Sequence, residues 1–230
     1  MKKLLKVLKP IIFGYGILYF ITIGLMILYY LTIGPDEIKM DENMISVMIV
    51  GITISIIPIS TFIYKKYHIK EEKINIKRLL YMIPLGFGVS WFYNMLTINF
   101  NQNNELLDLH ILIVIAYVVI LGPIFEELLF RYLALNKAKK VYSEKIALII
   151  ISISFGLMHS GLIGIIYAIL IGYLLGYIYI KEKNILYPII IHISANLASI
   201  FVSDFNIIFL IISIFLLLIS YFLLFKRNKV

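Results

Sequence analysis

The residues of this sequence that could do chemistry begin with two adjacent carboxylates, Glu126 and Glu127, and with Arg131 four positions after the second. On a helix Glu127 and Arg131 share a face, with the acid on the N-terminal side, which is the favourable order for an ion pair. Glu126 points about 100° away and has no partner in its own helix. Glu127 and Arg131 are therefore expected to form a supporting buried pair, whereas Glu126 is left to find another partner, take up a proton or do chemistry.

Two histidines extend this set of polar residues. His159 follows Phe155 by four positions, and His192 precedes Asn196 at the same spacing. Residues four apart lie on one helix face, so the imidazole of His192 and the amide of Asn196 can point at one place. A single histidine in an apolar helix can equally be a hydrogen-bond partner of a neighbouring helix. Because three apolar helices each carry such a polar cluster, we interpret Glu126 and the later residues as one catalytic site.

This set permits hydrolysis by an activated water, and two mechanisms remain open. In the first, Glu126 and His159 activate a water that attacks a peptide carbonyl, while His192 and Asn196 donate hydrogen bonds to the oxyanion. In the second, Glu126, His159 and His192 bind Zn²⁺, which lowers the pKa of a bound water to near 7. The sequence lacks H-E-x-x-H, a short-spaced zinc-ligand pair, so we favour the metal-free mechanism and expect no cofactor. It also lacks G-x-S-x-G and contains no cysteine, which removes two common nucleophiles.

The composition indicates the environment in which these residues must be held. Hydrophobic residues make up 62% of the 230 positions and charged residues 15%, whereas a soluble domain has about 45–50% and about 25%. A soluble fold of this size could not bury so much apolar surface, because its surface-to-volume ratio is too high. We therefore expect a single all-α membrane domain over residues 1–230, with the motif-bearing core at about 109–203.

Apolar runs of roughly 17–25 residues are long enough to cross a bilayer. The sequence predicts about eight transmembrane helices, near 10–33, 44–64, 79–98, 109–135, 146–159, 161–180, 185–203 and 207–225. The fifth is short and is expected to begin earlier, at about Val141. The three polar clusters fall in the fourth, fifth and seventh of these spans.

The basic residues predict the orientation of the spans. With eight spans, 19 of the 21 Lys and Arg residues fall on one side: the N-terminal segment, residues 65–78, 136–145 and 181–184, and the C-terminal tail. The opposite loops carry Lys39 and most of the acidic residues. Because Lys and Arg resist translocation, the basic side is expected to be cytoplasmic, which makes the chain N-in and C-in in a cell membrane. This arrangement accounts for the net charge of +8, so we expect a lipid bilayer rather than a nucleic acid as the partner.

Three motifs lie in order along the second half of the chain: Glu126-Glu127-x-x-x-Arg131, Phe155-x-x-x-His159 and His192-x-x-x-Asn196. They resemble the motifs of the CAAX protease and bacteriocin-processing family, also called CPBP or Abi, which includes the type II CAAX prenyl endopeptidases. The resemblance covers roughly residues 119–197. One of these motifs alone would be a weak signal, whereas all three in order on apolar spans are a strong one.

The resemblance implies an eight-helix intramembrane endopeptidase whose site faces a cytoplasm-side cavity and whose substrate is a peptide or a membrane protein. It assigns a role to each residue of the motifs: water activation to Glu126 and His159, the oxyanion site to His192 and Asn196, and support of the site to Glu127 and Arg131. Bacterial members of the family are linked to peptide maturation, bacteriocin immunity and regulation.

Two other classes of function are alternatives to an enzyme. A non-catalytic immunity or regulatory membrane protein would act by binding a toxin or a partner protein, and would not need Glu126 or His159. A small transporter would carry a polar site at the middle of the membrane. The transporter is disfavoured because the polar groups are confined to one half of the chain.

Overall fold

The structure is a computed structural model, and it describes residues 2–33, 42–97, 115–202 and 204–226. Its helices are α1 (Lys2–Ile33), α2 (Glu42–Tyr67), α3 (Ile76–Leu80), α4 (Met82–Thr97), α6 (Gly122–Glu127), α7 (Asn136–Ala138), α8 (Glu144–Gly156), α9 (Leu162–Glu182), α10 (Leu186–Ser199) and α11 (Ile207–Tyr221). Three further segments are π-helical: η3 (Ile115–Leu121), η4 (Leu128–Leu135) and η5 (Phe222–Lys226). No strand occurs in the described ranges, so the predicted all-α class is confirmed for them.

Some sequence-based predictions fall on residues outside these ranges. The first residues of the predicted fourth span, 109–114, lie outside the described residues, as does residue 98 at the end of the third. The same holds for Lys39, for the acidic residues at positions 36, 37, 41, 105 and 108, and for the basic residues at 227 and 229.

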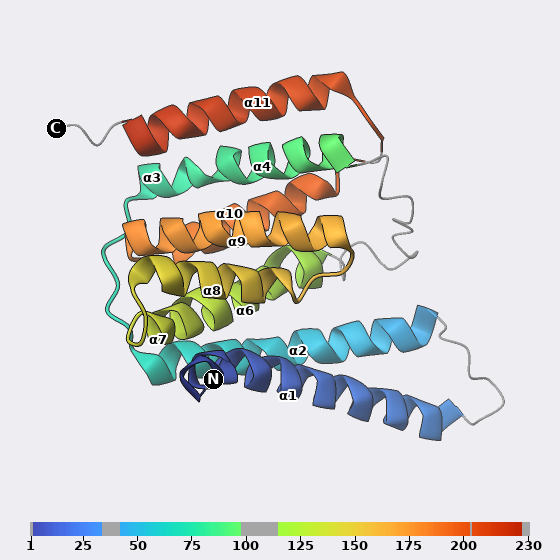
Figure 1. The fold of residues 1–230 in the computed structure, drawn as a ribbon. Coiled ribbons are helices and arrows are strands. Elements are labelled where there is room, and N and C mark those ends of the chain that lie inside the picture. The colour runs from blue at the N-terminus through green and yellow to red at the C-terminus, as the bar shows by residue number, and fades with distance from the viewer. Residues whose placement is uncertain (1, 34–41, 98–114, 203, 227–230) are drawn as a thin grey trace.

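The helices lie side by side in a bundle, with α1 and α2 at one edge and α11 at the other (Figure 1). The start of α1, the end of α2, the short α7 and the end of α9 are all found at the same end of this bundle (Figure 1). These segments carry the basic residues, so the described part of the chain gathers its positive charge at one end, as the sequence predicted. Which side of a membrane this end faces stays a prediction.

Within the described ranges, five helical runs are long and apolar enough to cross a membrane: Lys3–Thr32, Ile49–Tyr67, Ile76–Thr97, Leu162–Glu182 and Ile207–Leu224. The helix that carries His192 and Asn196 is also apolar but spans only 14 residues. A polytopic helical membrane protein is therefore confirmed, whereas the count of eight crossings stays a prediction.

The prediction for the fifth span was wrong at both ends. Ser143 caps α8, since its Oγ accepts a hydrogen bond from the Ile146 amide at 3.5 Å, and the helix begins at Glu144 rather than at about Val141. It ends at Gly156, so His159 follows the helix instead of lying in it. The chain then turns into α9 through Gly161, whose φ of 71° is readily adopted only by glycine.

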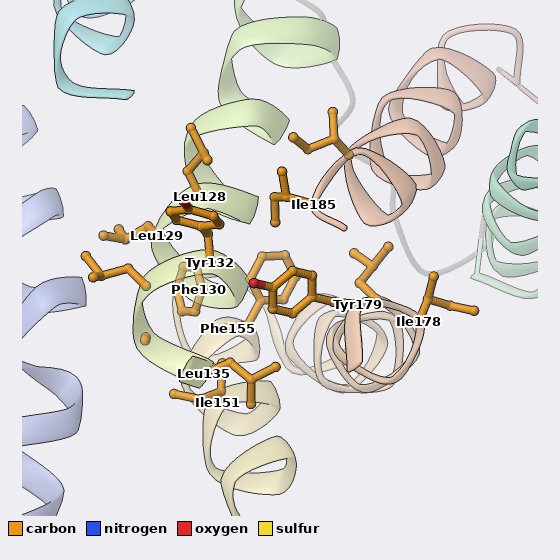
Figure 2. Close-up of a cluster of buried hydrophobic side chains, with 14 of the residues drawn as sticks. Leu128, Leu129, Phe130, Tyr132, Leu135, Ile151, Phe155, Ile178, Tyr179 and Ile185 are labelled. Carbon is orange, nitrogen blue, oxygen red and sulfur yellow. The ribbon is translucent and has the colours of Figure 1, made fainter. Parts of the chain in front are cut away.

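The hydrophobic core surrounds η4, all of whose residues are buried. The ring of Phe130 faces α8, and Tyr132 packs against Tyr64 of α2 at 5.3 Å between ring centroids (Figure 2). Phe130 packs edge-on against Phe155 of α8, with 5.1 Å between ring centroids. The two glutamates of α6 directly precede η4, so this buried segment fixes the position of the helix end that carries them.

Close contact between α4 and α10 fixes the helix that carries His192. A side chain at Gly86 of α4 would overlap Ser194 and the carbonyl of Ile191, and its Cβ would lie 3.0 Å from the amide nitrogen of Ala195. Only glycine allows α4 to approach the backbone of α10 at this point. The helix is therefore held by a side that does not carry His192 and Asn196.

The predicted orientation can be tested with single cysteines, because the chain has none. Lys73 and Ser160 are both exposed and lie in loops that the eight-span prediction places on opposite sides. In intact cells a membrane-impermeant maleimide should label Ser160→Cys, and Lys73→Cys should react only after lysis. Labelling of both variants from the same side would show that the predicted alternation is wrong.

Candidate active site

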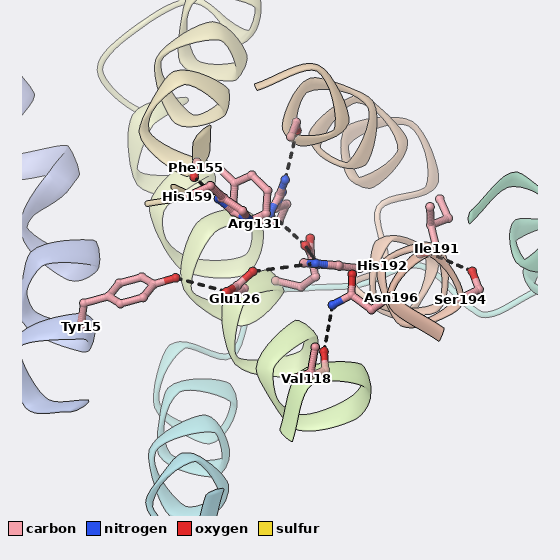
Figure 3. Close-up of polar contacts among 12 residues, drawn as sticks. Tyr15, Val118, Glu126, Arg131, Phe155, His159, Ile191, His192, Ser194 and Asn196 are labelled. Carbon is pink, nitrogen blue, oxygen red and sulfur yellow. Dashed lines mark hydrogen bonds and ion pairs between the residues drawn. The ribbon is translucent and has the colours of Figure 1, made fainter. Parts of the chain in front are cut away.

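One cavity of about 330 Å³ brings the four candidate catalytic residues together. Glu126 comes from the end of α6, His159 from the turn after α8, and His192 and Asn196 from α10 (Figure 3). The other lining residues are mostly apolar or aromatic: Tyr117, Val118, Gly122, Pro123, Phe155, Tyr167, Ala168, Ile171, Ala195 and Ser199. A concave, largely apolar site with a few convergent polar groups is typical of a catalytic or binding pocket.

Glu127 is the centre of a buried polar network beside this cavity. Its Oε1 accepts hydrogen bonds from Nη1 of Arg131 and from Nδ1 of His192, both at 2.8 Å. Arg131 also donates from Nη2 to the carbonyl of Gly172 in α9 at 3.1 Å, and its guanidinium lies 4.3 Å from the ring centroid of Phe155. The predicted Glu127–Arg131 pair is confirmed, and it binds further to α9 and α10.

This network determines which nitrogen of His192 faces the cavity. A carboxylate paired with an arginine can only accept hydrogen bonds, so Nδ1 of His192 carries a proton and donates it to Glu127. The other nitrogen, Nε2, points towards Glu126 and lies 3.8 Å from its Oε2. Glu127 thus orients the imidazole, as a carboxylate does for histidines at many catalytic and metal sites.

Glu126 is the less constrained of the two carboxylates. Its side chain is 24% exposed, whereas that of Glu127 is fully buried. Oε1 accepts a long hydrogen bond from the hydroxyl of Tyr15 at 3.4 Å, and the 3.8 Å to His192 exceeds hydrogen-bond length. Catalytic contacts are often loose in a structure without substrate. Glu126 therefore has its acceptor oxygens close to the cavity and available to a reactant.

His159 is held by the end of the helix that precedes it. Its Nδ1 lies 3.0 Å from the carbonyl oxygen of Phe155, and the two rings are 4.9 Å apart between centroids. Because a carbonyl only accepts, Nδ1 carries the proton and Nε2 is left as an acceptor. His159 thus contacts Phe155 four residues before it, although His159 lies in a turn rather than in the helix. Gly156, the last residue of the helix, packs against α9, where a Cβ would lie 2.9 Å from the carbonyl oxygen of Ile165.

Asn196 is anchored by the irregular helix on the other side of the cavity. Its Nδ2 donates to the carbonyl of Val118 in η3 at 2.8 Å (Figure 3). An amide nitrogen carries two hydrogens, so this bond fixes the side chain and leaves one N–H free to reach another acceptor. Asn196 and His192, which lie one turn apart on α10, therefore both present polar atoms to the cavity.

The arrangement does not fit a metal ion. Within the described ranges, no group of three His, Cys, Asp or Glu side chains is arranged to hold one. Glu126 and the two histidines line the same cavity, but they do not form the compact three-donor set that a catalytic zinc requires. We therefore derive no step of the reaction through a metal.

The comparison with known families agrees with the geometry. Residues 108–198 match the model of a family described as type II CAAX prenyl endopeptidase Rce1-like. The chain carries an Rce1-like region. The match contains Glu126, Glu127, Arg131 and the later motif residues, and it confirms the resemblance to the CAAX protease family. No curated protein and no solved structure matches the chain.

Tyr15 is a site residue that the sequence did not indicate. It lies in α1, outside the Rce1-like region, and reaches Glu126 across 111 positions of sequence. Edge-on contacts with Phe125 and Phe130 hold its ring, at centroid distances of 5.9 and 6.2 Å. The chain has 17 tyrosines, and nothing in the spacing of this one distinguishes it from the others.

Replacing Arg131 with methionine should lower the free energy of unfolding by about 3–5 kcal/mol, because the carboxylate of Glu127 would stay buried without its ion-pair partner. Denaturant or thermal unfolding in detergent measures this. The control Lys139→Met removes the partly exposed pair with Glu144 and should change stability by less than about 0.5 kcal/mol.

The double variant Arg131→Met/Glu127→Gln separates the effect of an unpaired buried charge from the effect of altered side-chain packing. It removes both charges and should recover most of the stability that the single variant loses. A loss below about 1 kcal/mol in Arg131→Met would contradict a buried ionic network.

Proposed function

We propose that the chain is an intramembrane endopeptidase that hydrolyses a peptide bond with a water activated by Glu126 and His159. The observation that carries this proposal is the single cavity of about 330 Å³ in which Glu126, His159, His192 and Asn196 meet. The match of residues 108–198 to the Rce1-like family supports a protease rather than a channel or a transporter.

The two acceptors of the cavity suit a nucleophilic water. The carboxylate of Glu126 and the unprotonated Nε2 of His159 can each accept one hydrogen of the same water molecule. Such a water has its lone pair directed away from both acceptors and towards a substrate carbonyl. When it attacks, Glu126 takes up the proton as the general base.

The two donors suit the oxyanion that this attack creates. The second N–H of Asn196 is one, and Nε2–H of His192 is the other. The second role requires His192 to be doubly protonated, since its Nδ1 already donates to Glu127. The ionised carboxylate of Glu127 stabilises that imidazolium. Collapse of the tetrahedral intermediate then breaks the C–N bond, and Glu126 returns its proton to the leaving amine.

An apolar groove next to the cavity supports a substrate that arrives from the membrane. The groove has a volume of about 410 Å³, lies between α4 and α9, and shares Tyr167 and Ile171 with the cavity. The rings of Tyr93 and Tyr167 stack at 3.8 Å between centroids where the two spaces meet. An apolar part of the substrate would lie in this groove while its peptide bond reaches Glu126.

Glu126→Gln should lower the rate of peptide cleavage by at least about 10³-fold, because an amide cannot accept the proton of the attacking water. Purified protein in liposomes is incubated with a peptide library, and the products are identified by mass spectrometry. Glu144→Gln is the matched control, since Glu144 is exposed and lies outside the cavity. Full activity of Glu126→Gln would exclude the proposed base.

A chelator separates the two mechanisms in the same assay. The metal-free mechanism predicts unchanged cleavage with the chelator present. Loss of cleavage that zinc restores would assign the reaction to a metalloprotease instead. A biological role that survives Glu126→Gln and His159→Ala would favour an immunity or regulatory protein that acts by binding.

Tyr15→Phe should reduce kcat by about 3- to 10-fold and leave KM nearly unchanged, since the hydroxyl holds the carboxylate of Glu126 but does not reach the substrate. Steady-state kinetics on the best peptide of the library measure both constants. Tyr19→Phe, one turn further along α1 at an exposed position, should behave as the wild type. Equal kcat values for the two variants would show that Tyr15 does not position Glu126.

A further inference from the structure

A second pocket lies away from the catalytic cavity, between α1, α2 and the end of η4. It has a volume of about 660 Å³, within the range of roughly 300–1,000 Å³ that small-molecule sites occupy. Its lining residues include three lysines from separate parts of the chain: Lys9 from α1, Lys66 from α2 and Lys137 from α7. None of the four candidate catalytic residues lines it.

The three lysines bring together positive charge that the protein does not neutralise. Among the described residues, neither Lys9, Lys66 nor Lys137 lies within ion-pair distance of a carboxylate. Elsewhere at this end of the bundle, Arg78 is paired with Glu182 at 2.7 Å and Lys139 with Glu144 at 2.9 Å. Like most lysines of the described ranges, these three have no carboxylate partner, and all three face one space.

The environment of Lys137 reflects this crowding. Burial, and then the charges of Lys9, Lys140 and Lys66, hold the pKa of Lys137 below its ordinary value. The ammonium lies 5.1 Å from the ring centroid of Tyr67, and that of Lys66 lies 4.9 Å from the centroid of Phe62. These ring faces weaken the repulsion between the lysines but supply no negative charge. A bound anion would supply that charge.

The rest of the pocket is apolar. From the lysines it runs along Phe13 and Ile17 of α1, Phe62 of α2 and Leu129 of η4. Lys9 and Ile17 are eight residues apart, so this apolar wall extends about 12 Å along the helix. The lysines lie at one end, which is the end of the bundle where the basic loops gather (Figure 1).

We propose that this pocket binds an anionic phospholipid, with the phosphate among Lys9, Lys66 and Lys137 and an acyl chain along Phe13, Ile17 and Phe62. Cationic side chains at one end and hydrocarbon along the rest match an amphiphile in charge and polarity. A free phosphate would leave the apolar wall unoccupied, and a neutral lipid would leave the lysines without a counter-ion. The site is separate from the catalytic cavity and does not depend on the proposed protease activity.

Native mass spectrometry of the full chain in detergent tests the proposal. Phosphatidylglycerol and phosphatidylcholine with identical acyl chains are titrated separately. We expect the wild type to bind phosphatidylglycerol in preference, and the triple variant Lys9→Gln/Lys66→Gln/Lys137→Gln to bind it roughly a hundredfold more weakly. The control Lys70→Gln/Lys73→Gln/Lys145→Gln removes the same charge from exposed positions outside the pocket and should bind as the wild type.

Two outcomes would overturn the assignment. Equal losses in the two triple variants would mean that general surface charge, and not this pocket, attracts the lipid. Competition by glycerol phosphate at the same concentration as the lipid would mean that the lysines bind an anion without the acyl chain. Retained far-UV circular dichroism and a retained unfolding midpoint show that the triple variants are folded.

Discussion

The rest of the site depends on the two hydrogen bonds that the buried carboxylate of Glu127 accepts, one from Arg131 and one from His192. Taking a carboxylate out of water is unfavourable by several kcal/mol unless charge and hydrogen bonds compensate. Arg131 supplies the charge from the same helical run, and His192 supplies a second hydrogen bond from α10. Since Arg131 also bonds the carbonyl of Gly172, one charged pair ties three parts of the bundle together. The geometry of the catalytic cavity follows from this requirement.

Irregular helix geometry provides the space beside this network. The run from Ile115 to Leu135 changes from π to α at Gly122 and back to π after Glu127. A Cβ at Gly122 would lie 2.9 Å from the carbonyl oxygen of Tyr117, and Pro123 next to it has no amide hydrogen to donate. Segments of π-helix are frequent at functional sites because they leave backbone groups and side chains out of regular register. Here the carbonyl of Val118 becomes free to anchor Asn196.

Much of this arrangement could be predicted from the sequence, because a charged residue inside an apolar run is unfavourable unless it has a partner. An unpaired charge in hydrocarbon costs at least about 2.5–3.5 kcal/mol, so the few polar residues inside apolar runs had to meet one another. That constraint predicted the Glu127–Arg131 pair from spacing alone. It could not predict that His192 would join the pair through Nδ1, because the register between two separate helices depends on contacts such as that of Gly86 with α10. The end of the fifth helix was misplaced as well: α8 ends at Gly156, where the chain lies close to α9, and the sequence of one helix does not show such a contact with another.

Tyr15 marks the limit of motif-based reasoning, and it also shows why α1 matters to the site. A helix outside the Rce1-like region supplies the hydrogen bond to Glu126, and it can do so because α1 packs closely on η4. A Cβ at Gly14 would lie 2.9 Å from the terminal methyl groups of Leu129, so a larger residue there would displace that side chain. Gly14 and Leu129 also line the lysine-bearing pocket. The same close contact thus forms one wall of that pocket and helps to set the distance from Tyr15 to Glu126. A shift of α1 relative to η4 would therefore change the pocket and that distance together.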